Sequence, residues 1–290
     1  LYVTLEPCST HGKTPPCTDI ILEKGIGRVV VSVVDLNPAH AGRGLEILEE
    51  AGVEVVSGVC EEAGRELIAP FEKYITTGMP YVTLKLASTL DGKIADSQGN
   101  SKWITGAEAR ERVQEMRRRA DAVMVGAATV RADDPSLMPR PANGRKPYRV
   151  IIGSNIPERS KVWSDEDAEW TLVFEMEGHC PQCPRTTGTS SLHANSLQNA
   201  LKQLAENYSV MHVLCEGGGK LAAGLVEEGL VDEFAFFIAP KLMGADGLPN
   251  FGKTGGLIGD VENLEFKAVE QLGKDLLLRA VFRQNDLKAK

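Results

Sequence analysis

The chain has 290 residues, 42% of them apolar and 25% charged, which is enough for one large or two ordinary globular domains. The net charge of -8 excludes a broad basic surface that follows a nucleic-acid backbone, and no apolar run is long enough to cross a bilayer, so no nucleic-acid or membrane partner is expected. The first residues lack the charged-then-apolar pattern of a secretion signal, which predicts a cytoplasmic protein.

Residues 1–77 alternate between strand and helix patterns, which predicts a βαβαβα unit with parallel strands. Strands are expected at residues 1–5, 28–35 and 53–57, and helices at 16–25, 44–51 and 61–76. Because Leu1 is not methionine and already belongs to a strand pattern, we expect that the front of this first domain is missing from the chain.

A second domain, residues 78–290, is predicted to begin after helix-breaking residues at Thr77-Gly-Met-Pro80. Strands are expected at residues 81–87, 122–126, 149–152, 171–174, 211–215, 231–238 and 276–283, and helices at 108–119, 197–207 and 219–228. Residues 178–192, rich in Cys, Pro, Ser and Thr, are predicted to form a surface loop. The sequence thus indicates two α/β domains.

The most specific motif is Leu5-Glu-Pro-Cys-Ser-Thr-His-Gly-Lys-Thr-Pro-Pro-Cys17. Cys8 is expected at a strand end and Cys17 at a helix start, where the helix dipole favours the thiolate form. Both thiolates can bind zinc, but a catalytic zinc takes three protein ligands and a water. The motif therefore predicts half of a metal site, and His11 and His40 are the alternatives that could supply a further ligand.

The second domain begins with stretches typical of a ligand pocket. In Lys85-Leu-Ala-Ser-Thr-Leu-Asp-Gly-Lys-Ile-Ala95, small residues follow a strand and let the backbone approach a flat ligand. Ser101-Lys-Trp-Ile-Thr105 places a hydroxyl beside an indole, a pair suited to stacking and orienting a ring. Trp103 is equally compatible with an ordinary core position.

Two further stretches can bind an anion. Residues 117–140 begin with three arginines and end with Arg140, and an arginine donates two parallel hydrogen bonds to a phosphate. Cys215-Glu-Gly-Gly-Gly-Lys-Leu-Ala-Ala-Gly224 places three glycines before a helix, whose first N–H groups can point at an anion. Taken alone, the arginines are also typical of a solvated helix end, and the glycines of a tight turn.

Two sets of motifs carry a resemblance to a known family. Glu6 to Cys17, followed by Asp35-Leu-Asn-Pro-Ala-His-Ala-Gly-Arg-Gly44, resembles the second half of the zinc site of cytidine-deaminase-type enzymes. In those enzymes an upstream His-x-Glu segment supplies the third ligand and the proton shuttle. With the later motifs in the same order, the whole chain is similar to bifunctional riboflavin-biosynthesis proteins, which join a deaminase half to a reductase half.

The resemblance implies the fold, the cofactors and the site residues. It implies a truncated cytidine-deaminase-like domain, with zinc at Cys8 and Cys17, followed by a dihydrofolate-reductase-like α/β domain that uses NADPH. The residues implied to contact NADPH are Ala87, Trp103, Thr129, Asp133, Ser154, Gly218, Gly219, Lys220, Leu221, Ala222, Ala223 and Gly224. Those implied to hold the substrate, a phosphorylated pyrimidine, are Ser101, Arg117, Leu137, Arg140 and Glu216.

The implied reaction reduces C1′ of a phosphoribosylamino group after its sugar ring has opened. NADPH supplies the hydride, and the protein supplies position and charge. We expect Arg117 or Arg140 at the phosphate, and Glu216 and Asp133 as catalytic residues that orient the sugar or deliver a proton. A homo-oligomer is also expected.

Two alternatives stay open. The chain could be a non-catalytic remnant that serves as an assembly partner, although its cofactor motifs are intact, which favours a fragment of the bifunctional enzyme. His179-Cys-Pro-Gln-Cys183 could bind metal or cycle as a dithiol, but only one such pair is present on a polar loop, so we interpret it as an incidental loop feature.

Overall fold

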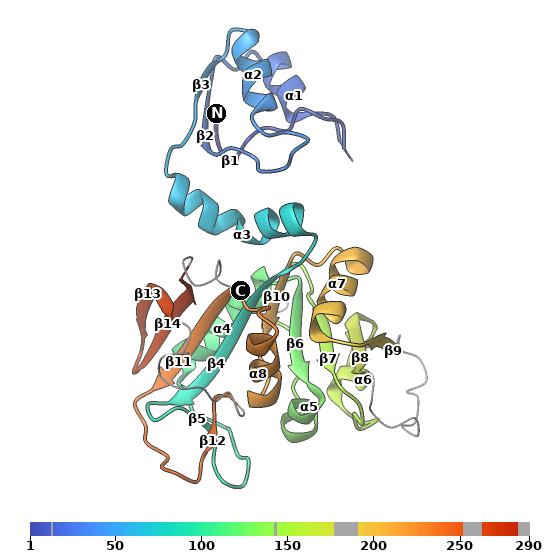
Figure 1. The fold of residues 1–290 in the computed structure, drawn as a ribbon, viewed down its shortest axis with the longest axis vertical. Coiled ribbons are helices and arrows are strands. Elements are labelled where there is room, and N and C mark those ends of the chain that lie inside the picture. Colours follow the sequence, from blue (N-terminus) through green and yellow to red (C-terminus); the bar gives the residue numbers. More distant parts are fainter. Residues whose placement is uncertain (13, 142–143, 177–190, 252–262, 284–290) are drawn as a thin grey trace. The chain divides into compact units, whose positions relative to one another are not determined.

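The structure, a computed structural model, describes residues 1–12, 14–141, 144–176, 191–251 and 263–283. The chain divides into two compact units, Leu1–Met79 and Pro80–Lys290 (Figure 1).

The first unit contains a three-stranded parallel sheet in the order β1-β2-β3. Its strands are β1 (Tyr2–Leu5), β2 (Arg28–Val33) and β3 (Glu54–Val56), and its helices are α1 (Cys17–Glu23), α2 (Arg43–Glu50) and α3 (Glu61–Thr77). Apolar residues of α1, α2 and β2 form one core, with Ile21, Val29 and Leu48 almost fully buried. This core holds α1, and therefore Cys17 at its start, against the sheet.

The second unit is built on a nine-stranded sheet in the order β13-β14-β11-β4-β10-β6-β7-β8-β9. Its strands are β4 (Tyr81–Thr89), β6 (Ala122–Gly126), β7 (Tyr148–Ile152), β8 (Thr171–Met176), β9 (Ser191–Ala194), β10 (His212–Cys215), β11 (Glu233–Ala239), β13 (Leu264–Leu272) and β14 (Asp275–Phe282). The strands from β11 to β9 are parallel, whereas β14 and β13 join antiparallel. Neighbouring parallel strands β4, β10 and β6 therefore end at the same edge, where ligands bind in open α/β sheets.

Helices and a small second sheet complete this unit (Figure 1). The helices are α4 (Ala107–Arg119), α5 (Ala127–Asp133), α6 (Lys161–Ser164), the 3-10 turn η1 (Ala168–Trp170), α7 (Leu197–Tyr208) and α8 (Gly219–Glu227), and the small sheet pairs β5 (Lys93–Ala95) with β12 (Leu248–Pro249). Helix α4 packs Ala109 and Val113 against Ala235, Phe237 and Leu277 of the sheet. The last turn of α4 carries Arg117, Arg118 and Arg119.

Most strands and helices lie within a few residues of the predicted bounds, and the differences have physical causes. Residues 127–133, for which no helix was predicted, form α5, a seven-residue helix shorter than the stretch over which an apolar helical period is recognised. Strand β13 was not predicted, because it is an edge strand whose side chains are largely exposed and give no burial pattern. Ser191 and Leu192 belong to β9 rather than to the predicted loop, and residues 177–190 lie outside the described part.

Candidate active site

The centre of the site is an ion pair between Arg117 on α4 and Glu216, the residue that follows β10. Nε and Nη2 of Arg117 donate to the two carboxylate oxygens of Glu216 at 2.6 and 2.9 Å, and the side chains are only 12% and 9% exposed. Burial alone raises the pKa of the Glu216 carboxyl, but the Arg117 charge and hydrogen bonds outweigh it, so the pKa is lowered. Glu216 is therefore an ionised acceptor at neutral pH.

Lys85 on β4 belongs to the same charged cluster. Its Nζ lies 5.6 Å from the ring centroid of Phe237, and its charge interacts with both Glu216 and Arg117. Burial lowers the pKa of the Lys85 ammonium; the Glu216 carboxylate opposes this shift and Arg117 adds to it. Lys85 was not among the predicted site residues, although a lysine within an otherwise apolar strand is a recognisable signal.

The segment Asp134–Arg140 borders this cluster and is fixed by hydrogen bonds to its backbone. The carbonyl of Met138 accepts from Arg117 at 3.3 Å, and the backbone N–H of Arg140 donates to Gln114 at 2.8 Å. Leu137 has a left-handed backbone (φ 61°) and a buried side chain packed among apolar residues, so only its main chain could touch a substrate. Arg140 is exposed at the segment's end.

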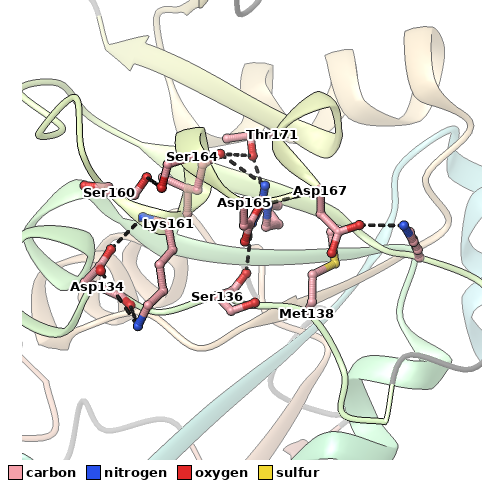
Figure 2. Close-up of polar contacts among 12 residues, drawn as sticks. Asp134, Ser136, Met138, Ser160, Lys161, Ser164, Asp165, Asp167 and Thr171 are labelled. Carbon is pink, nitrogen blue, oxygen red and sulfur yellow. Dashed lines mark hydrogen bonds and ion pairs between the residues drawn. The ribbon is translucent and has the colours of Figure 1, made fainter.

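A second polar network contacts the same segment (Figure 2). The carbonyl of Ser136 accepts from the guanidinium of Arg149 on β7, which also contacts Asp165 and Thr171. The carboxylate of Asp134 accepts from the backbone N–H of Lys161 at 2.8 Å. Figure 2 shows Ser136, Asp165 and Thr171 grouped together, with Asp134 and Lys161 beside them.

The Trp103 loop, residues 101–105, presents an exposed indole. The guanidinium of Arg110 lies 4.5 Å from the ring centroid of Trp103, whose side chain is still 64% exposed, so the indole is not a core residue. Lys241 donates from Nζ to the carbonyls of Trp103 and Ile104 at 2.9 and 2.7 Å, which ties the loop to the segment after β11. An exposed, supported indole can stack on a flat ring.

The Trp103 loop also contacts Asp133 at the end of α5. The hydroxyl of Ser101 donates to the Asp133 carboxylate at 3.4 Å, and Nζ of Lys102 lies 3.3 Å from the same carboxylate. The structure thus brings together Ser101 and Asp133, which the sequence placed far apart.

The glycine turn before α8, Gly217 and Gly218, directly follows Glu216. A Cβ on Gly217 would lie 2.7 Å from Leu221, whereas a Cβ on Gly218 would lie 3.6 Å from the Thr129 hydroxyl, so Gly218 and Thr129 face each other. Gly218 caps α8 without any side-chain hydrogen bond, which leaves the first N–H groups of the helix open to an anion.

The remaining residues implied for NADPH occupy less open positions. Leu221, Ala222 and Ala223 are buried in the core, and a Cβ on Gly224 would meet Leu197 on α7 at 3.0 Å. The part of α8 suited to a ligand is therefore its first turn, with Gly218, Gly219 and Lys220. Ala87 packs partly buried against the α4 face, and the carbonyl of Ser154 accepts from Arg131 at 2.9 Å.

In the first unit, Cys8 and Cys17 lie together as the motif predicted. The backbone N–H of Cys17 donates to Sγ of Cys8 at 3.2 Å, and the side-chain hydrogen bond with Cys8, followed by burial, raises the pKa of the Cys17 thiol. Across the described ranges, no group of three His, Cys, Asp or Glu side chains is placed to hold a metal ion. Within the described ranges, these residues alone do not build a zinc site.

Of the other cysteines in the described residues, Cys60 is exposed and Cys215 is buried. Burial raises the pKa of the Cys215 thiol to about 12, so this residue is a core thiol. Cys180 and Cys183 lie outside the described residues, and so does the predicted His179–Cys183 feature.

Of the helices described, none is both long and apolar enough to span a membrane.

Comparisons with known proteins agree with this arrangement. A family profile described as "RibD C-terminal domain" matches residues 80–278. The riboflavin biosynthesis protein RibD of Aquifex aeolicus is 43% identical over 96% of this chain and 79% of its own length, and that of Bacillus amyloliquefaciens is 40% identical over 97% and 78%.

Solved structures give the same result. A deaminase/reductase from Thermotoga maritima, titled diaminohydroxyphosphoribosylaminopyrimidine deaminase/5-amino-6-(5-phosphoribosylamino)uracil reductase, has a TM-score of 0.87 and 37% identity over 97% of this chain and 79% of its own. RibD of Acinetobacter baumannii has a TM-score of 0.86 and 35% identity over 98% and 80%. The likeness to the yeast reductase Rib7, at 18% identity and a TM-score of 0.54, concerns the fold alone.

The likeness to the Thermotoga and Acinetobacter structures over both units defines the second unit as a dihydrofolate-reductase-like α/β domain. This confirms the predicted fold class, since the structures similar to both units are deaminase/reductases. The chain belongs to the RibD family.

Proposed function

We propose that the chain is the NADPH-dependent reductase of riboflavin biosynthesis, which reduces the ribosyl group of 5-amino-6-(5-phosphoribosylamino)uracil. The observation that carries the proposal is the largely buried cluster of Lys85, Arg117 and Glu216, in which Arg117 also donates to the carbonyl of Met138 in the segment that ends at Arg140. The Thermotoga relative is named as a 5-amino-6-(5-phosphoribosylamino)uracil reductase, which supports the proposed activity. A non-catalytic assembly partner has no need of this buried charge.

The residues present fit NADPH on two observations. The indole of Trp103 is exposed and supported on Arg110, which suits stacking. The first turn of α8 is open and lies opposite the Thr129 hydroxyl, which suits a pyrophosphate. When bound, NADPH supplies the hydride that reduces C1′ of the ring-opened substrate.

The chain's own residues bind and orient the substrate. Arg140 is exposed, and within the described residues no carboxylate pairs with its guanidinium, so it can hold the substrate phosphate bidentately. Glu216, ionised beside Arg117, accepts hydrogen bonds from the sugar hydroxyls. A carboxyl whose pKa is lowered is a poor acid, so Glu216 orients the sugar and does not deliver the proton.

The proton comes from Lys85 in this proposal. When the C1′–N double bond is reduced, the nitrogen takes up one proton, and an ammonium with a lowered pKa gives a proton up more readily than an ordinary lysine does. Asp133, bonded to Ser101 and Lys102, positions the loop and carries no proton in this scheme.

The test is an assay of the purified chain with the authentic phosphoribosylamino-uracil and NADPH. We expect loss of NADPH absorbance together with a product heavier by two hydrogens, and slower turnover with NADH. A folded sample that binds NADPH but never reduces the substrate would contradict the proposal.

A further inference from the structure

We propose that Arg149 is a positioning residue for the phosphate end of the substrate, acting through the segment Asp134–Arg140; the inference rests on the proposed function. Arg149 lies on β7 and is fully buried, with a side-chain exposure of 0%. It touches none of the reacting groups described above.

The guanidinium of Arg149 donates four hydrogen bonds. Nη1 donates to Asp165 at 2.7 Å and to the carbonyl of Ser136 at 3.3 Å, Nε donates to Thr171 at 2.9 Å, and Nη2 donates to the carbonyl of Val162 at 3.1 Å. The contacts with Asp165, Thr171 and Val162 join β7, β8 and α6, whereas the Ser136 contact alone reaches the substrate segment. Figure 2 shows Ser136 beside Asp165 and Thr171.

Two guanidinium groups therefore hold the backbone on either side of Leu137. Arg149 binds the carbonyl before it, and Arg117, which also grips Glu216, binds the carbonyl after it at 3.3 Å. Leu137 has a left-handed backbone, which a branched side chain rarely adopts and which its surroundings must enforce. Burial of its side chain supplies the remaining support.

The position of Arg140 depends on this clamp. Arg140 lies three residues beyond Leu137, with its N–H bonded to Gln114 and its carbonyl to Arg118 at 3.2 Å. Loss of the Ser136 contact frees the first part of the segment and lets the Arg140 guanidinium move from its place. A displacement of about 1 Å in a binding group costs up to about a hundredfold in rate or affinity.

Removing Arg149 alone would leave Asp165 as an uncompensated charge, which can unfold a protein. The test variant is therefore Arg149→Met/Asp165→Leu, because replacing a buried ion pair by apolar residues is often neutral for stability. Arg149→Lys is the companion: it keeps the charge opposite Asp165 but lacks the fork that spans Ser136 and Thr171. Thr171→Val is the matched control, since it removes an Arg149 partner away from the segment.

Kinetics are measured with the phosphorylated substrate and with its dephosphorylated form, and NADPH affinity by fluorescence titration. Both Arg149 variants should raise KM for the phosphorylated substrate about ten- to a hundredfold. They should leave kcat, NADPH affinity and KM for the dephosphorylated form near those of the parent. Thr171→Val should lower Tm without changing either KM.

The activity of the unsubstituted chain distinguishes failure of the proposed reductase function from failure of the positioning role of Arg149. If the unsubstituted chain is inactive, the proposed function is wrong, whatever the variants do. With an active parent, an unchanged KM in folded variants overturns the positioning role. Equal losses for both substrate forms and NADPH also overturn it, since they indicate general loosening. If neither Arg149 variant folds, Asp134→Ala, which frees the same segment at its exposed start, must raise KM for the phosphorylated form alone.

Discussion

At the scale of single residues, the site separates two ligands by chemistry. The side chain of Trp103 is an exposed ring that contacts the guanidinium of Arg110. The side chain of Arg140 is an exposed charge, and the backbone N–H of the same residue is held by Gln114. A ring plane and a charged fork recognise different groups. Substitutions at these two positions should therefore affect different ligands.

Arg140→Ala should raise KM for the substrate about ten- to a hundredfold with little change in NADPH affinity, because a hydrogen bond to a charged group contributes about 1.5–3 kcal/mol. Trp103→Ala should weaken NADPH binding, measured by titration, more than it raises substrate KM. Arg43→Ala on the exposed face of α2 is the control for a lost surface arginine. Equal effects of both site changes on both ligands would show that the ligands are wrongly assigned.

Lys85 sets the expected pH dependence. The proton-donating form is the ammonium, so kcat should fall as the pH rises through the Lys85 pKa, which burial places below the ordinary value of 10.5. Lys85→Met should remove this limb of the pH profile and lower kcat about 10²- to 10⁴-fold. Lys202→Met, an exposed change on α7, should leave the profile intact. A Lys85→Met enzyme with the parent rate and profile would exclude Lys85 as the donor.

At the scale of elements, the turn before α8 offers a matched pair of glycines. Gly217→Ala should destabilise the fold, because its Cβ would lie 2.7 Å from a methyl carbon of Leu221 and force that buried side chain to move. Gly218→Ala meets Thr129 only at 3.6 Å, so the fold should persist while the methyl group narrows the anion site.

Melting temperatures and NADPH titrations distinguish the two variants. The account predicts a lower Tm for Gly217→Ala, and for Gly218→Ala a near-parent Tm with weaker NADPH binding. Parent-like NADPH affinity in Gly218→Ala would place the cofactor elsewhere.

Elements with a strong apolar period could be predicted from sequence, and those held by tertiary contacts could not. The buried run 28–33 and the amphipathic α4 carry their own signals, whereas α5 is too short and β13 too exposed to do so. The site follows the same division. The resemblance pointed to Arg117 and Glu216, but their bidentate pairing across 99 residues is visible only in the structure.

Positioning residues were the hardest to foresee. Lys241 lies 138 residues from Trp103 and Arg149 lies 13 residues from Ser136, and each binds main-chain carbonyls, which leave no trace in residue type. A single lysine after a strand, or an arginine within a strand, does not indicate from the sequence which main-chain carbonyl it binds.

At the scale of the whole molecule, the two compact units give separable expectations. Cys8 and Cys17 belong to the first unit, and every residue assigned to reduction belongs to the second. Cys8→Ser/Cys17→Ser should therefore leave NADPH oxidation within about twofold of the parent, as should treatment with a zinc chelator. A tenfold loss in reductase kcat from either treatment would show that the thiol pair influences the reductase site.

The central claim is that this chain reduces a phosphoribosylamino-pyrimidine with NADPH. The most direct measurement supplies the authentic substrate and NADPH to the purified chain and follows NADPH oxidation together with the product mass. The account predicts stoichiometric NADPH loss and a ribityl product carrying two additional hydrogens, with little turnover when Lys85 is methionine. A folded, NADPH-binding chain that leaves the substrate unreduced would contradict it.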